Sequence, residues 1–126
     1  MIKEFIKQIM NKLNEYYTAF YEEASKNTSF PYLVVPTLNI TPLNAGYRCL
    51  VDIEIYTNEL SETTIETIVE TLKNGLDEFS FNNEKIAFHL GLDNIYLSGS
   101  NEQDLKFKRI TFEARIFEKG GIENAS

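Results

Sequence analysis

The sequence predicts an α+β protein with an antiparallel or mixed sheet of about four strands and two amphipathic helices on one face of that sheet. Two stretches with helical spacing of apolar residues alternate with stretches in which apolar residues occupy every second position. Neither a linker nor an internal repeat interrupts the 126 residues, so residues 1–126 are expected to form a single domain around one core. The composition agrees, because 43% hydrophobic and 25% charged residues are typical of globular proteins.

The first predicted element is an amphipathic helix from Ile2 to about Ala24. Its apolar residues recur at intervals of three and four, with lysine and glutamate between them. The aromatic residues near its end have the same spacing and are assigned to the core. We expect the helix to end before the polar turn at 25–29.

A short β-rich stretch follows between Pro31 and Pro36. Proline cannot donate a hydrogen bond to a central ladder, so this stretch is expected near a sheet edge or at a bend. The next segment, 37–46, contains Pro42, Asn44 and Gly46, and predicts a long turn or the tip of a projecting hairpin.

The clearest strand is Tyr47–Tyr56, in which apolar and polar positions alternate. A second amphipathic helix should follow and run to near Glu78, past Asn74-Gly75. Ser61 and Thr63 are its candidate N-caps, and Thr63 and Glu66 have capping-box spacing.

Two long strands complete the predicted sheet. Apolar positions alternate from Ile86 to Leu92 and resume out of phase at Ile95, which predicts a bulge or turn at Gly91 or Asp93-Asn94. After a loop at 98–101, the last strand begins at Leu105, and its phase change predicts one inserted residue near Lys108 or Arg109. Residues 119–126 are expected to form a flexible tail.

Residues that could carry chemistry are few. His89 is the only histidine and has no metal-ligand neighbour at a suitable spacing, so we interpret it as a structural or surface residue. Cys49 shares the apolar face of its strand and is interpreted as a core thiol. Asp52 and Glu54 share the other face, where cross-strand ion pairs are more common than an acid/base pair or a cation site. We therefore predict no catalytic residue, no metal ligand and no cofactor, and do not expect an enzyme.

Charge and cysteine content limit the class of partner. A net charge of −7 and a pI near 4.7 argue against a protein that grips nucleic acid, because phosphate binding depends on clustered lysine and arginine. One cysteine fits a reducing compartment such as a bacterial cytoplasm. No apolar stretch resembles a signal peptide or a membrane span, so we expect a protein that stays soluble inside a cell.

The second face of the predicted sheet mixes apolar and charged side chains. Such a mixture is expected of a surface that contacts another subunit, although scattered apolar residues on an ordinary surface would look the same. The candidate subunit-contact or lumen face consists of Arg48, Leu50, Asp52, Glu54, Tyr56, Glu113, Arg115 and Phe117.

The order of elements and three segments resemble the tail terminator, or tail completion, proteins of long-tailed bacteriophages and phage-tail-like particles. The segments are Phe-Pro-Tyr-Leu-Val-Val-Pro at 30–36, Val-Asp-Ile-Glu-Ile-Tyr-Thr-Asn at 51–58, which leads into the second helix, and Arg-Ile-Thr-Phe-Glu-Ala-Arg-Ile at 109–116. Together with the helices, the resemblance spans nearly the whole chain.

This resemblance implies a virion structural protein, assembled in the bacterial cytoplasm, that forms a ring with itself, usually a hexamer. Such a ring caps the head-proximal end of the tail tube, ends polymerisation of the tail tube protein and joins the tube to the head-tail connector protein. DNA would pass through without specific binding, which the acidic charge allows. Segments 37–46 and 98–104 are where contacts with the tube are expected.

Two other interpretations remain at this point. One is a small α+β enzyme or ligand-binding domain with a pocket near Tyr96, His89 and the Asp52/Glu54 pair. The other is a different phage neck component, such as a head-tail adaptor, which would differ only in the neighbour that it contacts.

Overall fold

The structure is a computed structural model that describes residues 1–58, 64–97 and 105–119. It confirms the α+β class, but the predicted number of strands is wrong: the described residues form one mixed sheet of seven strands. The elements in chain order are α1 (Ile2–Asn14), β1 (Ala19–Tyr21), β2 (Tyr32–Val35), β3 (Leu38–Pro42), β4 (Tyr47–Asn58), α2 (Ile65–Leu76), β5 (Ser80–Asn82), β6 (Ile86–Leu97) and β7 (Leu105–Glu118).

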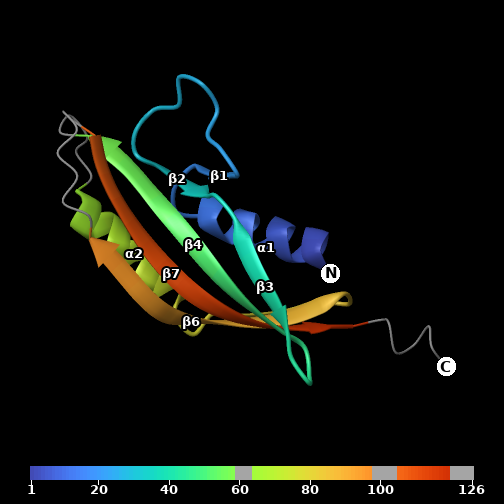
Figure 1. The fold of residues 1–126 in the computed structure, drawn as a ribbon. Coiled ribbons are helices and arrows are strands. Elements are labelled where there is room, and N and C mark those ends of the chain that lie inside the picture. The colour runs from blue at the N-terminus through green and yellow to red at the C-terminus, as the bar shows by residue number, and fades with distance from the viewer. Residues whose placement is uncertain (59–63, 98–104, 120–126) are drawn as a thin grey trace.

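The sheet is built around three long strands, β4, β7 and β6, which curl together across the molecule (Figure 1). The strand order is β1-β2-β4-β7-β6-β5, and only the β1–β2 pair is parallel. β2 and β3 share one side of β4, with β2 beside Glu54–Tyr56 and β3 beside Tyr47–Val51. The predicted position of the proline-bracketed strand near a sheet edge is therefore confirmed, because only the three-residue β1 lies outside β2.

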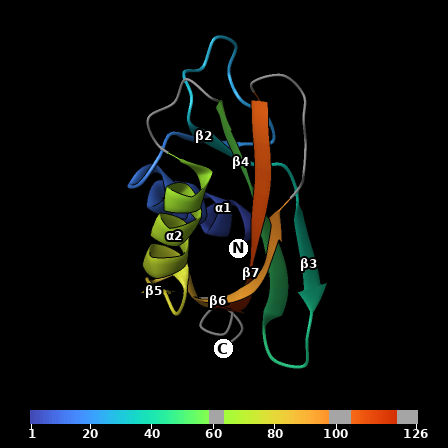
Figure 2. The same cartoon turned by 90° about the vertical axis from the view of Figure 1, so that its left-hand side faces the viewer.

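Both helices cover the same face of the sheet, as predicted (Figure 2). Their apolar stripes and the inward residues of the long strands form one cluster of buried side chains. Phe5 of α1 is fully buried and meets Phe88 of β6 edge to face, with ring centroids 5.1 Å apart. We call the face that the helices leave uncovered the outer face.

The first helix is shorter than predicted, because it ends at Asn14 rather than near Ala24. The side-chain oxygen of Asn14 accepts a hydrogen bond from the backbone N–H of Ala19 at 3.1 Å, and its amide donates to the Met10 carbonyl at 2.8 Å. These bonds close a turn and direct the chain into β1. Phe20, which has helical spacing in the sequence, lies in that parallel strand.

Segment 37–46 is a hairpin arm rather than a long turn. Its strand β3 pairs with the start of β4, and the backbone N–H of Leu43 donates to the Gly46 carbonyl at 3.0 Å. Gly46 has a φ of +78°, the left-handed conformation that glycine adopts without strain. The hairpin alternative is thus confirmed, and the arm projects at one end of the sheet (Figure 1).

The second helix begins with Thr64 as its N-cap, whose hydroxyl accepts a hydrogen bond from the Thr67 backbone N–H at 3.2 Å. Ser61 and Thr63 lie outside the described residues. The helix continues past Gly75 as predicted but ends at Leu76, two residues before Glu78. Glu78 has a φ of +64°, which a helix cannot contain.

The two predicted irregularities of the long strands have different outcomes. A register shift between Leu92 and Asn94 confirms the bulge in β6. The insertion predicted near Lys108 or Arg109 is wrong, because β7 pairs with β4 without a break from Leu105 to Ile116. Lys108 instead occupies an inward position of a regular strand, at the rim of a pocket that also contains Glu66 and Glu70. The 98–101 loop and residues 120–126 of the predicted tail lie outside the described residues.

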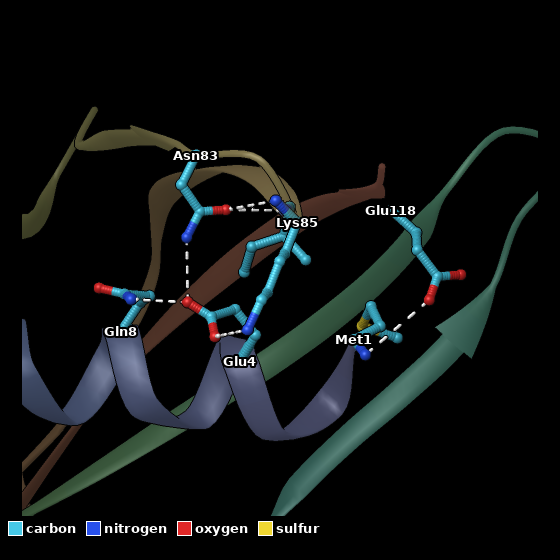
Figure 3. A network of polar contacts seen from close by, with 7 residues as sticks. Met1, Glu4, Gln8, Asn83, Lys85 and Glu118 are labelled. Atoms are coloured by element: carbon cyan, nitrogen blue, oxygen red, sulfur yellow. Dashed lines mark hydrogen bonds and ion pairs between the residues drawn. The ribbon is translucent and has the colours of Figure 1, made fainter. Parts of the chain in front are cut away.

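Polar contacts tie the start of α1 to the turn between β5 and β6 (Figure 3). Glu4 accepts hydrogen bonds from the amides of Gln8 at 2.7 Å and Asn83 at 3.0 Å. The side-chain oxygen of Asn83 accepts from the backbone N–H groups of Lys85 and Ile86. The two side-chain amides, and next the Lys85 charge, hold the pKa of Glu4 below its usual value despite partial desolvation.

Candidate subunit-contact face

All eight residues proposed for a contact surface lie on the outer face. The β4–β7 register pairs Arg48 with Arg115 and Leu50 with Glu113, and the alternation of each strand brings the others to the same side. Phe117 is 49% exposed, whereas Leu50 and Tyr56 are only partly exposed. The structure therefore brings these eight residues together on one surface formed by the two central strands.

Glu113 is the centre of a charged group on this face. Two arginines directly opposite each other on neighbouring strands would repel. Glu113 lies between them: Arg48 Nε donates to one carboxylate oxygen at 2.6 Å, and Arg115 Nε donates to the other at 3.1 Å. One carboxylate thus compensates two cations, and the group carries a net positive charge on an acidic protein.

The two arginines give Glu113 a measurable role in acid stability. Their hydrogen bonds hold its pKa below the usual value of 4.5, so the ionised form stabilises the fold above that value. This contribution is lost as the pH falls through the lowered pKa of the folded state. We expect Glu113→Gln to be less stable than the parent at pH 7 and to approach it in acid, as measured by urea unfolding from pH 7 to 3. A difference that stays constant across this range would contradict the prediction.

Asp52 and Glu54, the residues considered for acid/base or cation chemistry, have separate partners. The Thr111 hydroxyl donates to Asp52 at 2.6 Å, and the Tyr56 hydroxyl donates to Glu54 at 3.0 Å. Burial first, and then the Glu54 carboxylate, raise the pKa of Tyr56 to about 12. No group of three or more metal-ligating side chains occurs in residues 1–58, 64–97 and 105–119.

An aromatic cluster extends the outer face toward β1. Tyr32 stacks on Tyr56 with ring centroids 5.1 Å apart and on Phe30 at 5.4 Å, and Phe20 meets Tyr32 edge to face at 6.2 Å. Sequence reasoning missed Phe20, Phe30 and Tyr32. Residues 32–35 are all apolar and do not alternate, so they gave no signal for the face of Tyr32, and Phe20 was hidden by its helical spacing.

His89 is on the outer face near a second group that the sequence did not predict. Its Nδ1 lies 2.7 Å from the Ser80 hydroxyl, and its Nε2 lies 3.1 Å from a Glu78 carboxylate oxygen. The three side chains are all exposed, and His89 borders an open pocket of about 280 Å³ with Gly91, Glu113 and Arg115. His89 therefore faces away from the core, in agreement with its interpretation as a surface residue.

Cys49 is fully buried in the core, as its strand position predicted. Burial, and after it the nearby Asp52 charge, raise the pKa of this thiol to about 12, which keeps it protonated at neutral pH.

None of the helices in the described ranges has the length and apolar character needed to cross a membrane. In comparisons with known proteins, no family model and no curated protein matches the chain.

Proposed function

We propose that this protein is a virion structural protein that forms a hexameric ring on the head-proximal end of a phage tail tube. It ends polymerisation of the tail tube protein and joins the tube to the head-tail connector protein. The observation that carries the proposal is the outer face, on which charged, apolar and aromatic side chains of β1, β2, β4 and β7 are grouped opposite the two helices.

The composition of that face suits a contact between subunits. Interfaces are enriched in tyrosine, phenylalanine and arginine, and the outer face presents Tyr32, Tyr56, Phe117, Arg48 and Arg115 together. Arg48 and Arg115 share one carboxylate, so their remaining N–H groups are available to acceptors on a second, acidic copy of the chain. A ring requires such contacts to be heterologous, with this face meeting a different surface of the next copy.

The test is the association of the purified chain with itself and with the tail tube protein encoded in the same genome. We expect light scattering after size exclusion, or negative-stain microscopy, to show closed rings, alone or on tube ends. A protein that stays monomeric and has no affinity for tube ends would contradict the proposal. Binding to the connector but not to the tube would favour a head-tail adaptor.

A substitution on the outer face separates assembly from folding. Phe117→Lys replaces an apolar outer-face residue that is 49% exposed, which the fold tolerates, and adds a charge to the proposed interface. We expect ring formation to fall at least tenfold with an unchanged melting temperature. The matched control is Ile2→Lys, a 52% exposed apolar residue of α1, the helix that covers the other face of the sheet (Figure 2); its ring formation should equal that of the parent.

A second candidate, a small hydrolytic enzyme, is favoured by one observation, the Ser80–His89–Glu78 chain. A hydroxyl on an imidazole that a carboxylate orients is the arrangement that activates a nucleophile. All three side chains are exposed, so water screens the interaction of the carboxylate and the hydroxyl with the imidazole. Turnover of p-nitrophenyl acetate that Ser80→Ala and His89→Gln both abolish would establish it, and equal rates in parent and variants would reject it.

A further inference from the structure

The strand β3 has an unpaired edge that is protected only at its end, by Pro42. Among the described residues it pairs only with β4, so its other side exposes backbone groups. Natural edge strands are commonly protected along their length by charged residues, prolines, bulges or covering loops, because a free edge recruits another strand. β3 reads Leu-Asn-Ile-Thr-Pro, with no charged residue and no register shift.

The hydrogen-bond phase shows which groups of β3 are free. Leu43 and Gly46 form a bonded pair at the hairpin end, and bonded pairs alternate along an antiparallel ladder. Asn39 and Thr41 therefore bond to β4, while the N–H and C=O groups of Leu38 and Ile40 point away from it. Pro42 falls in the same outward phase, where its missing N–H costs β4 nothing.

A second free edge lies on the opposite side of the sheet. β5 pairs with β6 only at Ala87–His89, and the backbone N–H of Leu92 is bound by the Asp77 side chain at 2.8 Å. Beyond the bulge, no described residue pairs with the outer edge of β6 from Asn94 to Leu97. This edge and β3 lie at opposite sides and opposite ends of the sheet (Figure 1).

The two edges have the directions that a rotationally symmetric ring needs. β3 runs antiparallel to β4, whereas β6 runs in the same direction as β4, since both are antiparallel to β7. When copies keep the same orientation around a ring, β3 of one copy meets β6 of the next as an antiparallel pair. The offset between the edges staggers successive sheets, as closure of a tilted sheet requires.

The side chains of the two edges also match. On the inner face, Leu38 and Ile40 would continue the apolar surface of Ile95. On the outer face, the exposed polar residues Asn39 and Thr41 would lie beside Asn94 and Tyr96, which are exposed as well. We propose that β3 of one copy adds as a strand to the Asn94–Leu97 edge of β6 in a second copy, an inference that rests on the proposed ring and adds an edge-to-edge contact to the one made by the outer face.

Proline tests this contact without breaking the hairpin. Ile40→Pro removes an N–H that points away from β4, so the β3–β4 bonds remain. We expect self-association, measured by light scattering or on tube ends, to fall at least tenfold. The matched control Ile40→Ala also loses the isoleucine side chain but keeps the N–H, and should associate at least several times more strongly than Ile40→Pro. Equal association of Ile40→Pro and Ile40→Ala would overturn the strand contact.

Cysteine crosslinking provides a second measurement that does not depend on the fold tolerating proline. The native thiol is buried, so introduced cysteines react alone. A mixture of Asn39→Cys and Tyr96→Cys proteins should give a crosslinked dimer on mild oxidation, and neither protein should crosslink by itself. Crosslinking of Asn39→Cys alone would show β3 paired with β3 and overturn the proposal. Rings that form without the mixed crosslink would overturn this contact and leave the ring intact, whereas a parent that never associates contradicts the proposed function itself.

Discussion

Phe5→Ala is expected to lower the free energy of unfolding by about 3–5 kcal/mol, the cost of removing a large aromatic side chain from a packed core. Phe5 is fully buried and carries the edge-to-face contact between α1 and Phe88 of β6. A domain of this size has a total stability of about 5–15 kcal/mol, so one substitution removes a large share of it. Urea unfolding followed by circular dichroism measures the loss.

Two variants control for helix propensity and cavity size. Ile2→Ala changes an exposed apolar residue of the same helix and should alter stability by less than about 0.5 kcal/mol. Phe5→Leu retains most of the buried volume and should cost clearly less than alanine. If Phe5→Ala unfolds at the same urea concentration as Ile2→Ala, the packing of α1 against β6 is wrong.

Gly46→Ala is expected to cost about 3 kcal/mol, with two causes of similar size. The φ of +78° penalises any side chain by about 1–2 kcal/mol. An added Cβ would also lie 2.4 Å from the backbone oxygen of Ile116, an overlap whose relief costs about 1–3 kcal/mol. Because the clash is with backbone of the neighbouring strand, the hairpin and β7 must separate there. Thermal and urea unfolding both measure this.

Gly91→Ala is the matched control in the same sheet. A Cβ at Gly91 would meet no atom within 4 Å, and Ala is the better strand residue by about 0.5–1 kcal/mol. Its stability should therefore equal or slightly exceed that of the parent. Equal losses at the two glycines would show that the sheet tolerates no alanine at either place, contrary to the local geometry at Gly46.

Much of the fold could be predicted from periodicity. The alternation in β4, β6 and β7 identified all three long strands and the bulge at Leu92–Asn94, and the helical stripes identified α1 and α2. The short strands β1 and β5 were missed, because three residues carry no measurable period. The predicted insertion in β7 is wrong for a different reason. Lys108 is charged but takes an inward position at a pocket rim, so its charge wrongly indicated the outer face and a shift in the alternation.

The candidate face was predictable only where two long strands pair. The alternation of β4 and β7 supplied its eight residues, and their pairing then follows from one register. The arginines that share Glu113 could not be paired from sequence, because a shift of one residue would exchange the two faces. Ser80 and Glu78 reach His89 through a turn with a positive φ at Glu78, which no pattern in the sequence indicates.

The position of β7 has a consequence for how the chain folds during synthesis. It is the last strand of the described residues, yet it lies in the middle of the sheet and pairs with both β4 and β6. Until β7 leaves the ribosome, the facing edges of β4 and β6 have no partner, and the two halves of the sheet cannot join. The nascent chain must therefore wait with two long apolar strands unpaired, a state in which chaperones bind and neighbouring chains on a polysome can aggregate.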